Sequence, residues 1–490
     1  MKPHFFDLNY GVTRGDFMEI LHVAAECFPV AKAGGLGDVV GALPKYQNRL
    51  GVIAKVVIPM YRTSFLYQEE WELVHEGGQY LQEQFFKYSI IREKSNKLGF
   101  DLYLVDINGL LDREKVYGYS DDTERFIAFQ LAVCDWIFHW QHLPTIVHCH
   151  DHHCGLIPFF LTQTNQFRSR LQGIPTVFTV HNAQYQGAFD WSKHTLLPPY
   201  DSWKWNLLDW HGQINPLAAA VKSAWRVTTV SYSYLDELTV HAGGLEKLFE
   251  YEKGKCVGIL NGIDTEIWDP SCDPYLLFHY NKATMAEGKR KNKEEVCKEF
   301  GMDPSLPLFS FIGRLVGEKA ADLLPVAIQD ALLHNPGRAN YIVLGSGQKE
   351  IEYQLQELRN IAGGFYNCSI GYQEALSHSL YAASDFLLMP SRVEPCGLNQ
   401  LYALRFGTMP LVRRVGGLID TVIDIGDTGG YGICFNEASV WDITYSIRRA
   451  INLYYENPEK YKGHCAQMME LDFSWDKAAA NYLNLYTQLK

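Results

Sequence analysis

Residues 18–44, MEILHVAAECFPVAKAGGLGDVVGALP, contain the pattern that decides the fold class. A mostly apolar run over 18–24 predicts a buried strand, and Gly34, Gly35 and Gly37 follow it beside Lys32. Such a loop is either a tight structural turn or a place where a phosphate-bearing ligand lies against bare backbone. Lys32 favours the ligand, because an ammonium beside open backbone N–H groups suits a phosphate. The glycines do not form G-x-G-x-x-G, so the loop alone leaves both interpretations open.

Short apolar runs without alternation recur through the first half of the chain, as in buried parallel strands. They lie at 18–24, 52–59, 101–106, 146–149, 176–180, 226–230 and 256–260. The spacers are long enough for crossover helices, which predicts a doubly wound α/β sheet. The pattern pauses over 264–306 and restarts with PLFSFIGR, NYIVLGSG, YNCSI, DFLLMPS and MPLVR. We therefore expect a second parallel sheet.

The pause predicts a domain boundary near residue 265. We expect a Rossmann-like domain over 1–265, a second over 266–470, and a helix over 471–490 that packs back on the first domain. The apolar face of that helix consists of Trp475, Ala478, Ala479, Tyr482, Tyr486 and Leu489. Ligands of doubly wound sheets bind outside the carboxyl ends of the strands. Functional residues should therefore follow the strand runs directly.

Charge and composition exclude several classes of protein. The 490 residues include 56 acidic and 44 basic ones, for a net charge of −12, which argues against nucleic-acid or acidic-membrane binding. No apolar run is long enough to span a membrane, and the N-terminus lacks the apolar segment of a secretory leader. The 11 cysteines include no C-x-x-C and predict reduced thiols. We expect a cytoplasmic protein; the sequence leaves its oligomeric state open.

Two cations follow the first strand of the second pattern, in FIGRLVGEKAADLL. Arg314 and Lys319 are five positions apart and could clamp a diphosphate, Arg as a planar fork and Lys as a point charge. The alternative is a basic surface turn.

A carboxylate follows a later strand, in DFLLMPSRVEPCGLNQLYALRFG. Glu394 could hold a sugar hydroxyl, while Cys396 and Gly397 lead into a helix from about Leu398 whose N–H groups could bind phosphate. Glu394 could instead only complement the helix dipole. Cys396 is interpreted as a buried thiol rather than a nucleophile, because no local histidine would activate it.

Two histidine-bearing segments follow strands in the first half. VHCHDHHCGLIP resembles a metal site in composition, but one short backbone cannot turn every side chain from His148 to Cys154 toward one ion. We expect no metal there and a polar lining instead. In FTVHNAQYQGAF, His181 and Asn182 follow a strand directly, and His181 is either a site residue or a satisfied structural histidine.

Seven motifs together resemble those of the glycogen and starch synthases of the bacterial and plant type. They are KAGGLGDV, HCHDHHCGL, FTVHNAQYQG, ILNGIDTEIWDP, FIGRLVGEK, PSRVEPCGLNQLYALRFGT and VRRVGGLIDTV. The motifs run in order over nearly the whole chain. Related retaining sugar transferases carry a second Glu eight positions after the first, where this chain has Tyr402, as in the synthase branch.

The resemblance implies a GT-B fold, two Rossmann-like domains facing a central cleft. It implies transfer of glucose from a nucleotide diphosphate glucose, ADP-glucose favoured over UDP-glucose, to the non-reducing end of an α-1,4-glucan. Configuration is retained, and neither a metal nor another cofactor is required. The implied partners are thus the nucleotide sugar and the glucan.

The resemblance also assigns residues. The implied catalytic residues are Glu394, His181, Lys319 and Arg314. The implied donor-binding residues are Lys32, Gly34, Gly35, Asp38, Arg314, Lys319, Tyr372, Glu394, Cys396, Gly397 and Leu398, with Tyr372 stacked on the nucleobase. Asp151, His181 and Asn261 are implied to line the sugar and acceptor side.

Four positions depart from the family pattern near the expected phosphates: Ala33, Glu318, Ala320 and Asn399. They leave two alternatives open. One is a GT-B transferase with another donor or acceptor; the other is a weakened homologue that binds glucan or nucleotide as a regulator. Retention of Lys32, Arg314, Lys319 and Glu394 argues against the second.

Overall fold

The computed structural model describes residues 18–371 and 373–489, which form two compact units. The first unit holds the described residues as far as Val227 and those from Ala479 onward; the second is Thr228–Ala478. The sequence places its boundaries at 265 and 470 instead. The boundaries between the two units fall inside strand β10 and inside the last helix. The contacts within each unit therefore place the boundaries at other residues than the sequence composition does.

The first sheet has the strand order β11-β10-β7-β6-β1-β2-β5-β4-β3. Its strands are β1 (Glu19–Val23), β2 (Ile53–Pro59), β3 (Trp71–Leu81), β4 (Gln84–Glu93), β5 (Asp101–Asp106), β6 (Ile146–His150), β7 (Thr176–Val180), β10 (Arg226–Thr229) and β11 (Cys256–Gly258). The pairs of β1 with β2 and β6, of β2 with β5, and of β6 with β7 are parallel. All seven predicted strands of the first half are present.

The hairpin of β3 and β4 is absent from the sequence prediction. Its strands pair antiparallel with each other and with β5, so they extend the parallel sheet by an antiparallel edge. Most residues of the hairpin are half-buried or exposed, and Tyr88 and Ile90 are among its few buried residues. A partly exposed edge lacks the apolar run that identifies the central strands.

Helices of the first half are α1 (Gly35–Arg49), α2 (Ser64–Gln68), α3 (Asp122–Phe138), α4 (Ile157–Gln163), α5 (Arg168–Leu171), α6 (Pro216–Ser223), α7 (Tyr232–Leu238) and α8 (Glu246–Tyr251). A small ribbon of β8 (Asp209–Trp210) and β9 (Gln213–Ile214) stands apart from the sheets. Helix α1 packs tightly on the preceding loop, since a Cβ at Gly41 would lie 2.5 Å from the Phe28 carbonyl oxygen.

The second sheet has the order β14-β13-β12-β15-β16-β17, and every pair in it is parallel. Its strands are β12 (Leu308–Ile312), β13 (Asn340–Gly345), β14 (Tyr366–Ile370), β15 (Phe386–Met389), β16 (Met409–Arg413) and β17 (Ile433–Phe435). The restarted sequence pattern predicts the first five of these. Two sheets built mainly of parallel strands joined by helices confirm the predicted α/β class.

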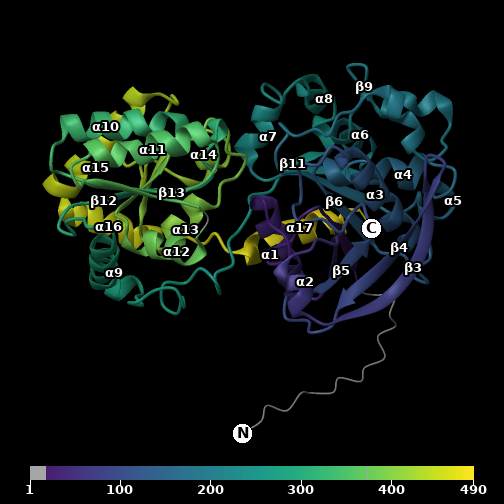
Figure 1. Ribbon diagram of the computed structural model, residues 1–490, viewed down its shortest axis with the longest axis horizontal. Helices are drawn as coiled ribbons and strands as arrows, with labels where there is room; N and C mark the ends of the chain where they lie inside the picture. The colour runs from purple at the N-terminus through teal and green to yellow at the C-terminus, as the bar shows by residue number, and fades with distance from the viewer. Residues whose placement is uncertain (1–17, 372, 490) are drawn as a thin grey trace, which may run out of the picture. The chain divides into compact units, whose positions relative to one another are not determined.

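Helices cover both faces of this second sheet (Figure 1). Figure 1 shows α10 (Leu324–His334), α11 (Lys349–Ile361), α14 (Gly417–Thr421) and α15 (Val440–Glu456) above it, and α9 (Met285–Phe300), α12 (Glu374–Ala383), α13 (Asn399–Arg405) and α16 (Pro458–Met468) below it. Each face of the sheet is thereby buried, which explains why its strands read as continuous apolar runs.

The C-terminal helix α17 (Trp475–Thr487) buries the predicted residues Trp475, Ala478, Ala479, Tyr482 and Tyr486, and Leu489, which follows the end of the helix, is buried as well. Within the first unit, the Tyr486 hydroxyl lies 2.7 Å from His148 Nδ1 of β6 and 3.2 Å from Gln47 Nε2 of α1. No helix in the described part of the chain combines the length and apolar character needed to cross a membrane.

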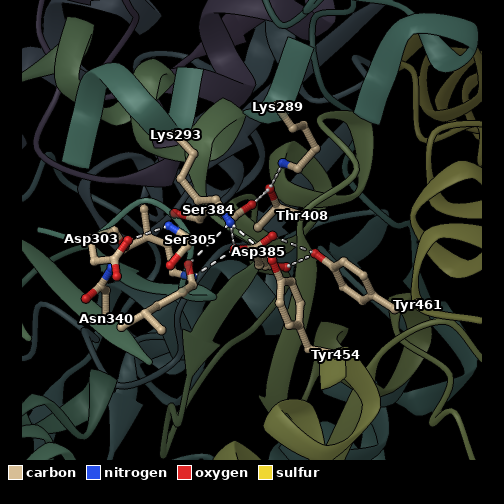
Figure 2. Close-up of polar contacts among 12 residues, drawn as sticks. Lys289, Lys293, Asp303, Ser305, Asn340, Ser384, Asp385, Thr408, Tyr454 and Tyr461 are labelled. Atoms are coloured by element: carbon tan, nitrogen blue, oxygen red, sulfur yellow. Dashed lines mark hydrogen bonds and ion pairs between the residues drawn. The ribbon is translucent and has the colours of Figure 1, made fainter. Parts of the chain in front are cut away.

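Helix α9 is lysine-rich in sequence, yet two of its lysines are buried (Figure 2). Lys289 Nζ donates to Thr408 Oγ1 at 2.7 Å and to the Ala382 carbonyl at 3.0 Å, and burial lowers the pKa of Lys289 to about 8. Lys293 Nζ donates to Asp385 Oδ2 at 2.9 Å. Because positions four apart share a helix face, both amines reach the same buried layer.

Asp385→Asn is expected to destabilise the second unit by about 3 kcal/mol, because it leaves the Lys293 charge buried without its counter-ion. Asp385 also accepts from the Leu308 backbone N–H and the Tyr461 hydroxyl. The measurement is a urea unfolding curve of the full chain. Glu295→Gln is the matched control, since Glu295 pairs with Lys298 of the same helix at 3.9 Å on the surface. Equal midpoints for the two variants would contradict the prediction.

Candidate functional site

The glycine loop after β1 is organised by a carboxylate, Glu26. Its Oε2 accepts from the backbone N–H of Ala33 at 2.6 Å and of Gly34 at 3.0 Å, and its Oε1 accepts from the Tyr117 hydroxyl at 2.6 Å. Burial raises the pKa of Glu26 above its usual range. The backbone N–H groups that the sequence predicts to be open are therefore already bonded at Ala33 and Gly34. Glu26 ends the apolar run of the opening stretch, where nothing in the pattern distinguishes it.

The glycine loop still carries two charged side chains and leaves open space beside its backbone. Lys32 Nζ lies 2.8 Å from Asp38 Oδ1, so two predicted site residues form an ion pair, about a quarter to a third exposed. A Cβ at Gly34 would meet nothing within 4 Å, and its φ of −155° is open to any residue. Helix α1 begins at Gly35. The glycine at 34 thus leaves open space rather than relieving backbone strain.

Asp151 and His181 meet because they follow neighbouring parallel strands, β6 and β7. Asp151 Oδ1 accepts from the His181 backbone N–H at 2.7 Å, and burial raises the pKa of Asp151 to about 7. The Asp151 backbone has φ 56° and ψ 176°, a region that costs a non-glycine residue roughly 1–3 kcal/mol. Strain of this kind is typical of functional sites. Glu26 follows β1 and adds negative charge that also raises the pKa of Asp151.

A chain of buried histidines leads inward from His181. His181 Nε2 lies 3.0 Å from His150 Nδ1, and His150 Nε2 lies 3.0 Å from His22 Nδ1. His22 Nε2 lies 2.8 Å from Gln47 Oε1. Burial lowers the pKa of His22 to about 4 and that of His181 to about 3, so these rings are neutral at neutral pH. His22 belongs to this chain of histidines, but the sequence does not single it out because it stands within an apolar run.

One ring nitrogen from each of His22, His148 and His150 lies within 4.8 Å of the other two, close enough to share a metal ion. His148 Nδ1 lies 2.7 Å from the Tyr486 hydroxyl, and His148 Nε2 lies 2.6 Å from Thr179 Oγ1. With the bonds above, both nitrogens of all three rings already have partners. The arrangement favours a hydrogen-bond network over a metal site. A second group consists of His75 in β3 and of Asp135 and His139 at the end of α3, and it contains none of the predicted site residues.

In the second unit, Lys319 and Glu394 form a bidentate ion pair. Lys319 Nζ lies 2.7 Å from Glu394 Oε1 and 2.6 Å from Oε2, and the Ser391 hydroxyl donates to Oε2 at 2.8 Å. The two residues follow β12 and β15, which are parallel neighbours in the sheet. Glu394 is 6% exposed. The pair therefore lies at the carboxyl edge, where doubly wound sheets bind ligands.

The departures Glu318 and Ala320 flank Lys319 and have distinct structural effects. Glu318 Oε2 lies 3.0 Å from Arg314 Nη2, so the added carboxylate pairs with the other predicted clamp residue, whose side chain is 48% exposed. Ala320 has φ 52° and ψ 31°, a left-handed conformation that costs an alanine roughly 1–2 kcal/mol. Glycine would adopt this conformation without that cost, so the departure at Ala320 carries a conformational penalty.

The segment after Glu394 is held by close backbone contacts. Gly397 has φ 75°, and α13 starts at Asn399, one residue after the predicted Leu398. Gly416, with φ 46°, has no room for a side chain, since a Cβ there would lie 2.1 Å from the Glu394 carbonyl oxygen. Burial raises the pKa of Cys396 to about 12, so its thiol is protonated, as a buried thiol rather than a nucleophile should be.

Two asparagines of the second unit remain: Asn399, one of the four departures from the family pattern, and Asn261, a predicted site residue. Asn399 Nδ2 donates to the Ile312 carbonyl at 2.6 Å and ties α13 to the end of β12. Within the described residues, Asn261 Oδ1 is buried without a hydrogen-bond partner, which is costly unless a ligand supplies a donor. Tyr402 stacks on Trp268 with ring centroids 3.7 Å apart, as a core residue does. The predicted nucleobase contact, Tyr372, lies outside the described residues.

Two family models match the chain. One is described as the starch synthase catalytic domain and covers residues 19–251; the other, glycosyl transferases group 1, covers residues 292–463. A glycogen synthase from Flavobacterium johnsoniae is 51% identical over 469 residues, 96% of this chain and 98% of that protein. One from Streptococcus sanguinis is 36% identical over 489 residues, 96% of this chain and 100% of that protein.

Solved structures agree with these relatives. The catalytic domain of starch synthase IV from Arabidopsis thaliana, bound to ADP and acarbose, has a TM-score of 0.88 and 31% identity, covering 96% of this chain and 99% of that chain. A sucrose-phosphate synthase from Thermosynechococcus elongatus has a TM-score of 0.62 at 15% identity, covering 96% of this chain and 99% of that chain, and shows likeness of fold alone.

Proposed function

Because this chain belongs to the family of glycogen and starch synthases, glucose-transferring enzymes with the GT-B fold, we propose that ADP-glucose is its donor. The proposed acceptor is the non-reducing end of an α-1,4-glucan. The starch synthase IV domain that resembles this chain binds ADP in its own structure, which supports the adenine nucleotide over UDP-glucose. The observation that carries the proposal is the bidentate pair of Lys319 and Glu394 at the carboxyl edge of the second sheet.

The proposed roles follow from charge. Lys319 and Arg314 neutralise the diphosphate that leaves with the nucleotide, as preorganised cations do in phosphate-transfer sites. A diphosphate would compete with Glu318 for Arg314. Glu394 accepts hydrogen bonds from glucose hydroxyls, and the backbone of Cys396, Gly397 and Leu398 lies against the sugar. Tyr372 stacks on the adenine.

We assign Asp151, His181 and Asn261 to the sugar and acceptor side. Asp151 and His181 offer a carboxylate and a neutral imidazole, and Asn261 offers its buried oxygen. Lys32, Gly34, Gly35 and Asp38 form the loop that approaches the donor. The bond between the anomeric carbon and the diphosphate breaks, and the acceptor hydroxyl attacks from the same face and gives its proton to the leaving phosphate, so configuration is retained without a protein carboxylate as nucleophile. In this proposal residues 1–265 supply the glucan side and the glycine loop, and residues 266–470 supply the nucleotide-sugar side, in a cytoplasmic enzyme.

The test is nucleotide release measured with glycogen, with ADP-glucose and UDP-glucose side by side. We expect glycogen-dependent release of ADP at least 10-fold faster than of UDP, and little release when glycogen is omitted. Faster release of UDP would contradict the donor assignment. Absence of release from both donors, with ADP still bound by calorimetry, would favour a regulatory binding protein.

A further inference from the structure

The buried histidine chain is directional, and its direction is set at Gln47. This side chain is fully buried in α1 and contacts two branches. Its Oε1 faces His22 Nε2 at 2.8 Å, and its Nε2 faces the Tyr486 hydroxyl at 3.2 Å. A carboxamide has one accepting end and one donating end, so it imposes a different role on each neighbour.

The first branch runs from Gln47 to His181. Gln47 Oε1 can only accept, so His22 carries its proton on Nε2 and leaves Nδ1 bare. A neutral imidazole has one N–H, so His150 must donate from Nε2 to His22 Nδ1. His150 Nδ1 is then bare, and His181 must donate to it from Nε2. His181 is left with a lone pair on Nδ1.

The second branch runs from Gln47 to His148. The Gln47 amide donates to the Tyr486 oxygen, so that hydroxyl is free to donate its proton to His148 Nδ1. His148 then carries its own proton on Nε2 and donates to Thr179 Oγ1. Both branches are satisfied together. Turning the Gln47 amide over would reverse every bond in both, so one side chain couples four buried rings.

We infer that Gln47 is a positioning residue that selects the Nε2–H tautomer of His181 through His22 and His150. The inference rests on the proposed function for its consequence. With the proton held on Nε2, Nδ1 of His181 is an acceptor for a sugar hydroxyl; the opposite tautomer would present a donor. The wrong tautomer of an otherwise intact catalytic histidine is known to be costly in enzymes.

The first test uses the native protein and needs no activity. Long-range proton–nitrogen NMR correlations of histidine rings distinguish the two neutral tautomers, because the bare nitrogen resonates far from the N–H nitrogen. Single His→Gln variants assign the signals of His22, His148, His150 and His181. We expect all four rings to be Nε2–H. An Nδ1–H signal from His22, His150 or His181 would overturn the inference.

The second test replaces Gln47 with methionine, which keeps the volume and removes the acceptor. A buried N–H without a partner is less tolerated than a bare acceptor, so the His22 proton should move to Nδ1. His150 and His181 must then follow, and His181 becomes Nδ1–H. Gln130→Met is the matched control, since Gln130 is also a buried glutamine but bonds the Phe126 carbonyl and the Leu156 N–H, away from both branches, and its loss should leave His181 as Nε2–H. A Gln47→Met variant with His181 still Nε2–H would refute the coupling.

Kinetics give an independent readout. Gln47→Met should lower kcat roughly 10-fold, the lower end of the cost of losing the hydrogen-bond partner that fixes the tautomer of a metal-ligating histidine, with an unchanged KM for the donor. The tautomer spectrum and the activity separate the two claims. If Gln47→Met switches the tautomers but the native protein shows no glucan-dependent transfer, the positioning role is supported and the proposed function is contradicted. If the native protein is active but Gln47→Met leaves the tautomers unchanged, the proposed function is supported and the positioning role is contradicted.

Discussion

Glu394→Gln is expected to lower kcat for glucose transfer by on the order of 10³-fold, while ADP binding and the fold are kept. Both carboxylate oxygens of Glu394 accept from Lys319 Nζ, at 2.7 and 2.6 Å, and Oε2 also accepts from Ser391. Glutamine replaces one oxygen by an NH₂ group, which cannot accept and which faces an ammonium. The ammonium turns away, and the acceptor for the glucose hydroxyls is lost.

Glucan-dependent ADP release measures this loss, and calorimetry with ADP measures retained binding. Asp322→Asn is the matched control, because Asp322 pairs with Arg392 on the same side of the second sheet without contacting Glu394. We expect the control to stay within about twofold of the native rate. A Glu394→Gln enzyme with full transfer would remove Glu394 from the sugar-holding role.

Lys319→Ala is expected to lower kcat by about 10²-fold or more, the usual cost of removing one preorganised group that stabilises developing charge. In this chain the lysine also holds the Glu394 carboxylate in place. Alanine removes the charge that would offset the leaving diphosphate and leaves a buried carboxylate without its counter-ion. Weaker ADP binding should accompany the slower turnover.

Steady-state kinetics and ADP calorimetry check this prediction. Lys349→Ala is the control: Lys349 pairs with Glu352 at 2.7 Å but is mostly exposed, so its loss should change neither quantity. The double variant of Lys319 and Glu394 should be little slower than the slower single one, since both changes break the same contact. Unchanged turnover in Lys319→Ala would exclude Lys319 from diphosphate binding.

Continuous apolar runs predict every central strand of both sheets, because parallel strands buried on both faces need apolar residues at successive positions. This reasoning does not identify the hairpin of β3 and β4, because a partly exposed edge strand does not need apolar residues at successive positions. Motif residues after the strands could also be identified, including Lys319 and Glu394. Their positions follow from the rule that ligands bind at the carboxyl ends of parallel strands.

Strand order decides which of those residues meet. Lys319 and Glu394 are 75 positions apart, and they form a pair because β12 and β15 are neighbours in the sheet. Likewise His22, Gln47 and His150 come from three separate elements and are invisible as a set in the sequence. No local pattern encodes such neighbours.

The sequence by itself determined the α/β class, the two sheet patterns and the residue types available at each strand end, since these depend on local periodicity and composition. The tertiary structure alone decided the partners: Glu26 on the loop N–H groups, Glu318 on Arg314, and Gln47 at the junction of the histidine branches. It also showed the left-handed backbone at Ala320. Hydrogen bonds and charge pairs depend on distances through space, which exist only once the chain has folded.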